Sequence, residues 1–228
     1  MLLDGISIKG SYHKVNQDFF ITRSIDKGFV AVLSDGLGSI KHSQKGSKAI
    51  CKCAVKTAVK LGEKLLKISP KLLMKKLHKQ WLRKIRPYKP KDCYATLLLF
   101  IVYGNRGIAI RLGDGFIGIW HDGGTDILSD YDEDKILNVT HCLSEKTILS
   151  DCAFAEFTFS KLYGGVMCSD GIEISDMREE TLRNFTREFV EGYRDMAVKD
   201  ISKDIYGWLK KWHGNDDKTL AYFISERN

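Results

Sequence analysis

The stretch that decides the fold reads Val30-Ala31-Val32-Leu33-Ser34-Asp35-Gly36-Leu37-Gly38-Ser39. Its apolar half predicts a buried strand, which carries the Asp35 carboxylate at its tip. Two glycines follow, and they permit a sharp turn that leaves backbone carbonyls open. Asp-Gly is also a common tight turn, so this stretch alone does not establish a functional site.

Two later stretches repeat the pattern of an apolar run bounded by acidic residues. The run Gly164 to Cys168 leads into Ser169-Asp170-Gly171, and Asp216-Asp217 precedes the run Leu220 to Ile224. Three such runs predict one shared cation site.

Composition indicates an ordinary globular protein. Of the 228 residues 43% are hydrophobic and 29% are charged, which excludes general disorder. No Pro-, Gly- or Ser-rich linker interrupts the chain, so a single domain over residues 1–228 is expected. The longest apolar run, residues 95–103, is shorter than the roughly 20 residues of a membrane helix. The first residues do not resemble a signal peptide, and we expect a cytoplasmic protein without a membrane partner.

The six cysteines, at positions 51, 53, 93, 142, 152 and 168, follow no regular spacing. We interpret them as reduced thiols of the core. The histidines form no pair at helical spacing, so a zinc enzyme is not expected.

Periodicity places strands at residues 6–8 and 19–21, on either side of a loop over 10–18. Asp18 would then head a strand that pairs with the Asp35 strand and could face the same site, although Asp at a strand entry is also a routine turn residue. Amphipathic helices are expected over 39–60 and from Ser69-Pro70 to about residue 86.

The second half of the chain predicts further strands and two further helices. Strands at 95–103, 108–112 and 116–120 would form an antiparallel meander. Asp114 could serve as a fourth carboxylate of the site, but Gly113-Asp114-Gly115 between two strands favours a hairpin turn. Residues 129–145 would form a surface flap, and a strand at 154–159 would pair with one at 162–168. Ser175-Asp176 would cap the third helix. Antiparallel strands with helices in separated pairs fit an α+β sandwich of sheets covered by helices on both faces.

Lysine and arginine greatly outnumber the single Glu63 between Lys60 and Lys91. Such a run can grip nucleic acid, but lysines spread over helical positions are usually a solvated face. No aromatic interleaving or recognition-helix motif accompanies the run, so nucleic acid is not an expected partner.

The chain resembles the metal-dependent protein serine/threonine phosphatases of type 2C, the PPM family, in their compact bacterial form. The matching pieces occur in the family's order: Asn16-Gln17-Asp18, Ser34 to Ser39 with Ser43 to Gly46, Ala95 to Leu98, Gly113-Asp114-Gly115, Asn138-Val139-Thr140 with Leu143, Ser169-Asp170-Gly171, and Asp216 to Thr219. The resemblance implies a four-layer α-β-β-α sandwich of two antiparallel sheets flanked by helix pairs.

The resemblance also implies two or more divalent cations, Mn²⁺ or Mg²⁺. Asp35 would bridge two ions, the Gly36 carbonyl would bind one of them, and Asp170 and Asp216 would bind the other. Asp18 would hold metal-bound waters. Hard carboxylate and carbonyl oxygens suit these cations better than zinc, and the ions would activate a water without a phosphoenzyme.

Two positions depart from the family pattern. His13 stands where the family has an arginine that grips phosphate, and Gln17 stands where it often has Glu. We expect His13 to face the phosphate pocket as a substitute donor, although it lacks the guanidinium fork. Setting Thr219 on the family's threonine makes Asp216 the ligand and leaves Asp217 as a hydrogen-bonding support.

The expected function is hydrolysis of phosphoserine and phosphothreonine in a phosphoprotein substrate, in opposition to a bacterial serine/threonine kinase, by a monomer. The alternative is a pseudophosphatase that uses the same fold as a binding module without turnover.

Overall fold

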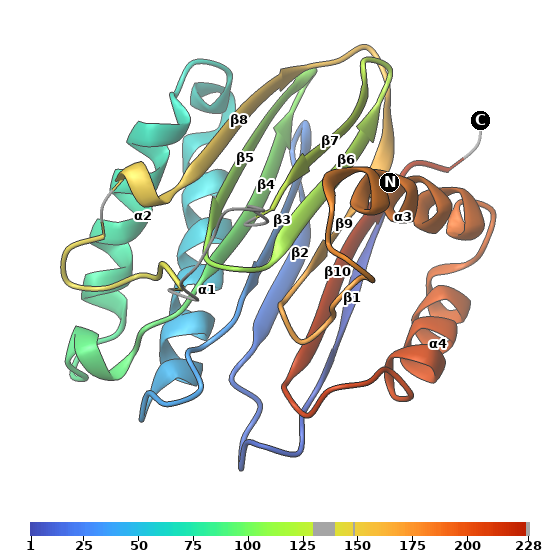
Figure 1. Cartoon of the computed structure of the whole chain (residues 1–228). Helices are drawn as coiled ribbons and strands as arrows, with labels where there is room; N and C mark the ends of the chain where they lie inside the picture. Colours follow the sequence, from blue (N-terminus) through green and yellow to red (C-terminus); the bar gives the residue numbers. More distant parts are fainter. Residues whose placement is uncertain (130–139, 148, 227–228) are drawn as a thin grey trace.

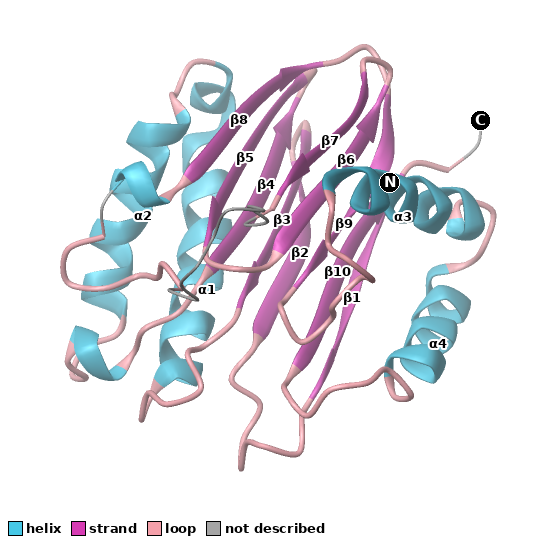
Figure 2. Ribbon diagram, in the orientation of Figure 1, coloured by secondary structure: helices cyan, strands magenta, loops and turns pink. Residues whose placement is uncertain are grey.

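The protein is described here from a computed structural model, which describes residues 1–129, 140–147 and 149–226. Two antiparallel sheets of five strands face each other, and a pair of helices covers the outer face of each sheet (Figure 1 and Figure 2). This arrangement confirms the expected four-layer α-β-β-α sandwich.

The sheet that contains β3 will be called the β3 sheet. Its strands follow the order β2-β3-β4-β5-β8, and their bounds are Phe19–Ile25, Gly28–Ser34, Leu97–Tyr103, Arg106–Leu112 and Ala153–Thr158. The other sheet, called the β9 sheet, has the order β1-β10-β9-β6-β7. Its bounds are Leu2–Ile8, Lys218–Ile224, Leu162–Cys168, Phe116–His121 and Gly124–Leu128. The central strands β3, β4 and β10 are apolar runs that are buried almost throughout, as expected for strands covered on both faces.

Helices α1 (Ser43–Leu61) and α2 (Pro70–Lys84) pack on the β3 sheet. Between them lies the short 3₁₀ helix η1 (Gly62–Leu66), and two further 3₁₀ turns span Pro90–Asp92 and Leu149–Asp151. The expected cap of α2 is confirmed, because the Leu72 N–H donates to Ser69 Oγ at 3.3 Å. Helix α1 begins four residues later than expected, since the Ile40 and His42 N–H groups bond the carbonyls of Leu37 and Asp92 in a turn.

Helices α3 (Glu179–Tyr193) and α4 (Val198–Leu209) cover the β9 sheet. The prediction that Ser175-Asp176 caps α3 is wrong, because the helix starts at Glu179 and Arg178 occupies its N-cap. Ser175 has a φ of 44° and Met177 a φ of 57°, which a helix start does not accommodate. Asp176 accepts instead from the Arg178 N–H at 3.1 Å, within the turn before the helix.

Three apolar layers hold the sandwich together. One lies between α1, α2 and the β3 sheet, one between the two sheets, and one between the β9 sheet and α3, α4. At the centre of the middle layer the ring of Phe100 lies 5.0 Å from that of Phe223 and 5.9 Å from that of Phe29, so residues of both sheets interlock.

Two predicted strand pairings are wrong. The predicted meander fails at its last step, because β5 pairs with β4 and β8 while β6 pairs with β7 and β9 in the opposite sheet. The predicted pairing of the strands at 154–159 and 162–168 also fails. Strand β9 already has β10 and β6 as neighbours, and the half-exposed β8 forms the edge of the β3 sheet.

Other expectations concern cysteines, membranes and the flap. All six cysteines are free thiols, and five of them are buried. None of the described helices combines the length and the apolar character needed to cross a bilayer. Most of the expected flap over 129–145 lies outside the described residues. Within it, Leu143 is buried and pairs with Ala95.

Candidate metal centre

The Asp35 turn follows β3 directly and is held by the residues before β4. The Thr96 N–H donates to the Asp35 carbonyl at 2.7 Å, and the Leu37 N–H donates to the Tyr94 carbonyl at 3.2 Å. Gly36 lies between these two bonds, opposite Ala95 in an antiparallel bridge. In such a pair the N–H and C=O of the central residue point away from the partner strand. The Gly36 carbonyl is therefore not used by the sheet.

Three carboxylates from different parts of the chain converge beside this turn. One oxygen each of Asp35, Asp114 and Asp170 lies within 4.8 Å of the other two. Asp35 ends a strand of the β3 sheet, Asp170 follows β9 of the other sheet, and Asp114 lies in the connection between the sheets. The cluster thus joins both sheets at one edge of the sandwich.

Asp114 owes its position to the sheet crossing at Gly113-Asp114-Gly115. A Cβ on Gly113 would come 2.5 Å from Thr96 Cγ2, and one on Gly115 would come 2.4 Å from the Cys168 carbonyl. Gly113 also has a φ of 112°. The crossing therefore requires glycine on both sides of Asp114. The preferred interpretation of Gly113-Asp114-Gly115 as a hairpin turn is wrong, and the structure places Asp114 with Asp35 and Asp170, as the less favoured alternative of a fourth carboxylate requires.

Asp18 heads β2 next to the cluster and is buried, with 6% of its surface exposed. Its Oδ2 accepts from the Ser169 hydroxyl at 2.9 Å, and its carboxyl lies within hydrogen-bonding reach of Asp35. Asp18 Oδ1 is buried and has no hydrogen-bond partner among the described residues. Asp114 Oδ1 shares this condition, although its Oδ2 accepts from the Thr140 hydroxyl at 2.6 Å.

The carboxylates repel one another and are poorly hydrated. Burial raises the pKa of Asp35 well above its usual value, and the charges of Asp18 and Asp170 raise it further. Burial likewise raises the pKa of Asp18, against hydrogen bonds from its neighbours that lower it. The pKa of Asp170 rises to about 7 through desolvation and the charge of Asp114, even though part of this residue is exposed to solvent. A bound cation would neutralise this cluster of negative charges and stabilise the ionised carboxylates.

The donor set fits a hard divalent cation. Buried carboxylate oxygens without a hydrogen-bond partner, on Asp18 and Asp114, are costly unless something positive fills the space between them. All donors here are oxygens, which favours Mg²⁺ or Mn²⁺. The described cluster contains no thiolate or imidazole, the ligands that zinc prefers.

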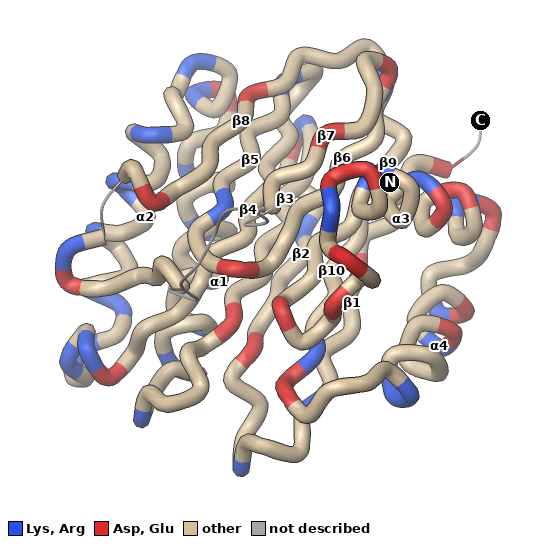
Figure 3. Tube along the Cα trace, in the orientation of Figure 1, with Lys and Arg blue, Asp and Glu red and all other residues tan. Residues whose placement is uncertain are grey.

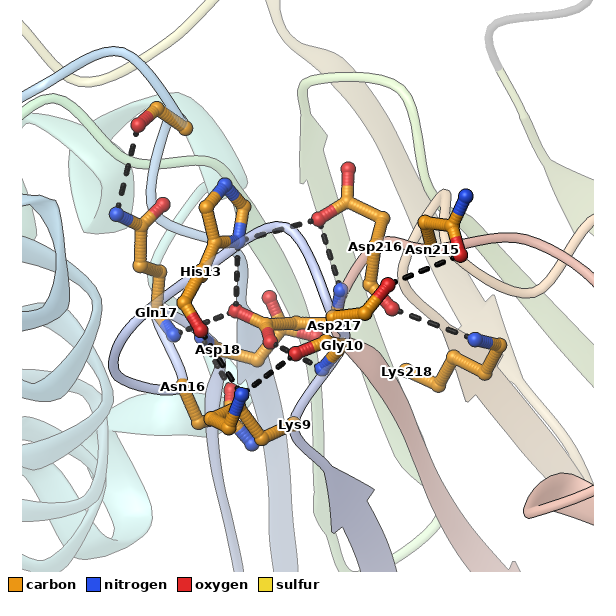
Figure 4. Close-up of polar contacts among 12 residues, drawn as sticks. Lys9, Gly10, His13, Asn16, Gln17, Asp18, Asn215, Asp216, Asp217 and Lys218 are labelled. Atoms are coloured by element: carbon orange, nitrogen blue, oxygen red, sulfur yellow. Dashed lines mark hydrogen bonds and ion pairs between the residues drawn. The ribbon is translucent and has the colours of Figure 1, made fainter.

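Asp216 and Asp217 lie at the entry to β10, and their side chains take different surroundings (Figure 4). The Asp217 side chain is 1% exposed and accepts from the backbone N–H groups of Gly10 and Gln17, both at 2.7 Å. This confirms that Asp217 acts as an acceptor for backbone donors. The Asp216 side chain is 46% exposed, and its charge contributes to the raised pKa of Asp170. The structure groups Asp216 with His13 and Asp217 and not with Asp35, Asp114 and Asp170, so its role as a metal ligand stays a prediction.

His13 lies beside Asp216 and Asp217 (Figure 4). Its Nδ1 lies 3.2 Å from Asp217 Oδ2 and 3.4 Å from Asp216 Oδ1. On the opposite side of the ring, a Cβ on Gly38 would come 2.9 Å from Nε2. The ring is thus fixed by carboxylates at one nitrogen, and only Nε2 remains for another contact.

The fold and the site together define a layered α+β sandwich with a carboxylate-rich centre at one edge. A family model described as Protein phosphatase 2C matches residues 11–210. The chain therefore belongs to the protein phosphatase 2C family, whose enzymes are protein phosphatases. The search of curated proteins found no match to this sequence.

Solved structures share the fold at low identity. The serine/threonine phosphatase Stp1 from Staphylococcus aureus superposes with a TM-score of 0.67 at 12% identity, over 100% of this chain and 96% of that one. The serine/threonine phosphatase of S. agalactiae gives a TM-score of 0.67 at 13% identity, over 99% of each chain. RsbX in complex with magnesium gives 0.58 at 16% identity, over 96% of this chain and 92% of that one.

Proposed function

We propose that this protein hydrolyses phosphoserine and phosphothreonine in proteins, with water as the nucleophile. The observation that carries the proposal is the convergence of Asp35, Asp114 and Asp170 beside the unpartnered Oδ1 of Asp18. Bound there, two or more Mn²⁺ or Mg²⁺ ions would lower the pKa of a water and neutralise the oxygens of a phosphoryl group.

Each residue of the centre has a distinct proposed role. Asp35, at the middle of the cluster, would be shared between two ions, and the Gly36 carbonyl would complete one of them. Asp170 and the exposed Asp216 would hold the second ion from the side of the β9 sheet. Asp18, oriented by the Ser169 hydroxyl, would accept hydrogen bonds from waters in the centre. Asp114 is added to this set as a further carboxylate.

The neighbouring hydroxyls support water as the nucleophile. The Ser34 hydroxyl, next to Asp35, donates to the Thr96 carbonyl at 2.6 Å. The Ser169 hydroxyl, next to Asp170, donates to Asp18. Both serines are buried, with 0% and 2% of their surface exposed, so neither hydroxyl is accessible to a phosphoprotein substrate.

The substrate would be a phosphoprotein made by a serine/threonine kinase, and we propose that a monomer acts on it in the cytoplasm. One observation favours the alternative of a pseudophosphatase that binds a partner without turnover. His13, in the position of the family's arginine, has its Nδ1 beside two carboxylates, so it offers a phosphate one nitrogen rather than a fork.

Hydrolysis of p-nitrophenyl phosphate and of phosphopeptides separates the two functions. Turnover should require Mn²⁺ or Mg²⁺, vanish in EDTA and return when the metal is restored. Asp35→Asn should remain folded and lose at least about a hundredfold in rate, close to 3 kcal/mol of transition-state stabilisation. Asp126→Asn, which changes a carboxylate paired with His121 outside the cluster, is the matched control and should keep its rate.

Full turnover in EDTA would refute the metal mechanism. A folded protein that binds Mn²⁺ but hydrolyses none of these esters would favour the pseudophosphatase.

A further inference from the structure

The helical layer on the β3 sheet concentrates the positive charge of the protein. Residues 43–91 contain 16 lysines and arginines and only one acidic residue, Glu63, which gives this segment a formal charge of +15. Because the whole chain carries +7, the remaining residues carry −8. Figure 3 shows the basic positions gathered along α1 and α2.

A groove runs between α1 and α2 on this layer. Its volume is about 740 Å³, and its floor includes Thr57, Leu61 and Ile68. Cationic side chains from both helices, from η1 and from the residue after η1 form its walls: Lys56, Lys60, Lys64, Lys67, Lys76, Lys79 and Arg83. No carboxylate lines the groove.

None of these wall cations forms an ion pair within the part of the chain that the structure describes. The nearby Glu63 pairs with Lys27, which lies outside the groove. On α3, by contrast, Arg183 pairs with Glu179 and Arg194 with Glu191 at helical spacing. A surface helix that only needs to be solvated is stabilised by such pairs.

The spacing of the lysines carries a cost in stability. Lys48, Lys52, Lys56 and Lys60 follow one another at intervals of four residues, so each lies over the next on one side of α1. Like charges at this spacing destabilise a helix. A ligand that supplies negative charge would offset the repulsion.

We propose that this groove binds an acidic protein segment. Negative side chains of the segment would lie between the two rows of cations, and an apolar side chain would contact Leu61, Ile68 or the half-exposed Leu72 on the groove. Nucleic acid fits less well, because six of the seven cations are lysines and no aromatic side chain lines the groove for base stacking. A hollow between helices also suits a chain segment better than a flat membrane surface.

The position of the groove specifies the substrates that can use it, and this step rests on the proposed function. Helix α1 begins beside the metal centre, because a Cβ on Gly36 would come 2.8 Å from Ser43. Lys56, the α1 wall cation nearest to that end, lies 13 residues further along the helix, at about 20 Å. An extended chain covers this distance in about six residues. Substrates would therefore carry the acidic segment at least about six residues from the phosphorylated residue.

Fluorescence anisotropy with a short labelled peptide of glutamates and two leucines tests the binding without reference to catalysis. Lys56→Gln/Lys60→Gln/Lys79→Gln removes three wall charges and should weaken binding about tenfold. Lys71→Gln/Lys75→Gln/Lys91→Gln removes three exposed charges of the same layer outside the groove and should weaken it less than about threefold.

Equal loss in the two variants would show that only the general field of the layer attracts the peptide, and would overturn the proposal. So would tighter binding of duplex DNA or of phosphatidylserine vesicles than of the peptide, if it depends on the wall lysines. Hydrolysis of p-nitrophenyl phosphate should be the same in all three proteins. If none of them is active, the proposed function fails while the anisotropy still decides on the groove.

Discussion

Asp216 and Asp217 are adjacent in sequence, and we predict that their loss affects different properties of the protein. Asp217→Ala would leave the N–H groups of Gly10 and Gln17 buried without an acceptor, where each now has one at 2.7 Å. A buried donor that loses its partner costs about 1–3 kcal/mol, so the free energy of unfolding should fall by roughly 3 kcal/mol or more. The Asp216 side chain is 46% exposed, and among the described residues the one backbone N–H that donates to it is that of the neighbouring Asp217. Asp216→Ala should therefore lower the free energy of unfolding by less than about 1 kcal/mol.

Urea unfolding in EDTA, followed by circular dichroism, measures the stability of both variants without a contribution from bound metal. Manganese-dependent hydrolysis measures the other property. Asp216→Ala should be stable and inactive, whereas Asp217→Asn, which keeps one acceptor oxygen, should retain a substantial part of the turnover. If Asp216→Ala proves as unstable as Asp217→Ala, or Asp217→Asn proves inactive while Asp216→Ala turns over, the assignment of the ligand is wrong by one residue.

Three further predictions concern the centre itself. Asp114→Asn should lower the rate at least about tenfold and raise the Mn²⁺ concentration needed for half activity; an unchanged rate would return Asp114 to the role of a turn residue. The folded pKa of Asp170 is about 7 against a usual 3.8, and the pKa values of Asp18 and Asp35 are also raised. Between about pH 4 and pH 7 the metal-free folded state therefore binds more protons than the unfolded chain. Its free energy of unfolding should fall as the pH rises through this range. Urea titrations in EDTA at several pH values check the sign, and a rise would contradict the repulsion described here. His13→Arg should lower the KM for small phosphate esters and His13→Ala should raise it; if KM is the same in both, the ring does not reach the phosphate.

The layers and the first site residues could be predicted because they depend on local patterns. The short apolar run before Asp35, bounded by an Asp-Gly turn, favours a strand covered on both faces, and the amphipathic helices between the strands favour packing against a sheet. Asp18, Asp35 and Asp170 stand at the ends of such runs, so their positions along the chain imply their positions in space.

Strand partners could not be predicted in the same way. The apolar pattern of β5 and β6 indicates that both strands are buried, but it does not indicate that they belong to different sheets. An aspartate flanked by glycines has the same sequence in a hairpin turn as in a connection between two sheets. For this reason the hairpin turn was preferred to a carboxylate role for Asp114. The signal in the sequence was the glycine on each side of Asp114, since a hairpin turn does not need both. The structure shows the reason: a Cβ on Gly113 would approach Thr96 closely, and a Cβ on Gly115 would approach the Cys168 carbonyl.

The pairing of β1 with β10 has a consequence for synthesis of the protein. Leu2 lies opposite Ile224, so β1 cannot form this pairing until β10 has been translated, more than 200 residues later. Strand β10 lies between β1 and β9 and directly follows Asp216. A ribosome-bound chain that reaches only Gly214 therefore lacks the strand between β1 and β9, and it also lacks Asp216 and the Asp217 carboxylate that contacts His13. Under the proposed function, the proposed ligand Asp216 and the last strand of the sheet are added in the same step of synthesis, so chains truncated before this step should be inactive.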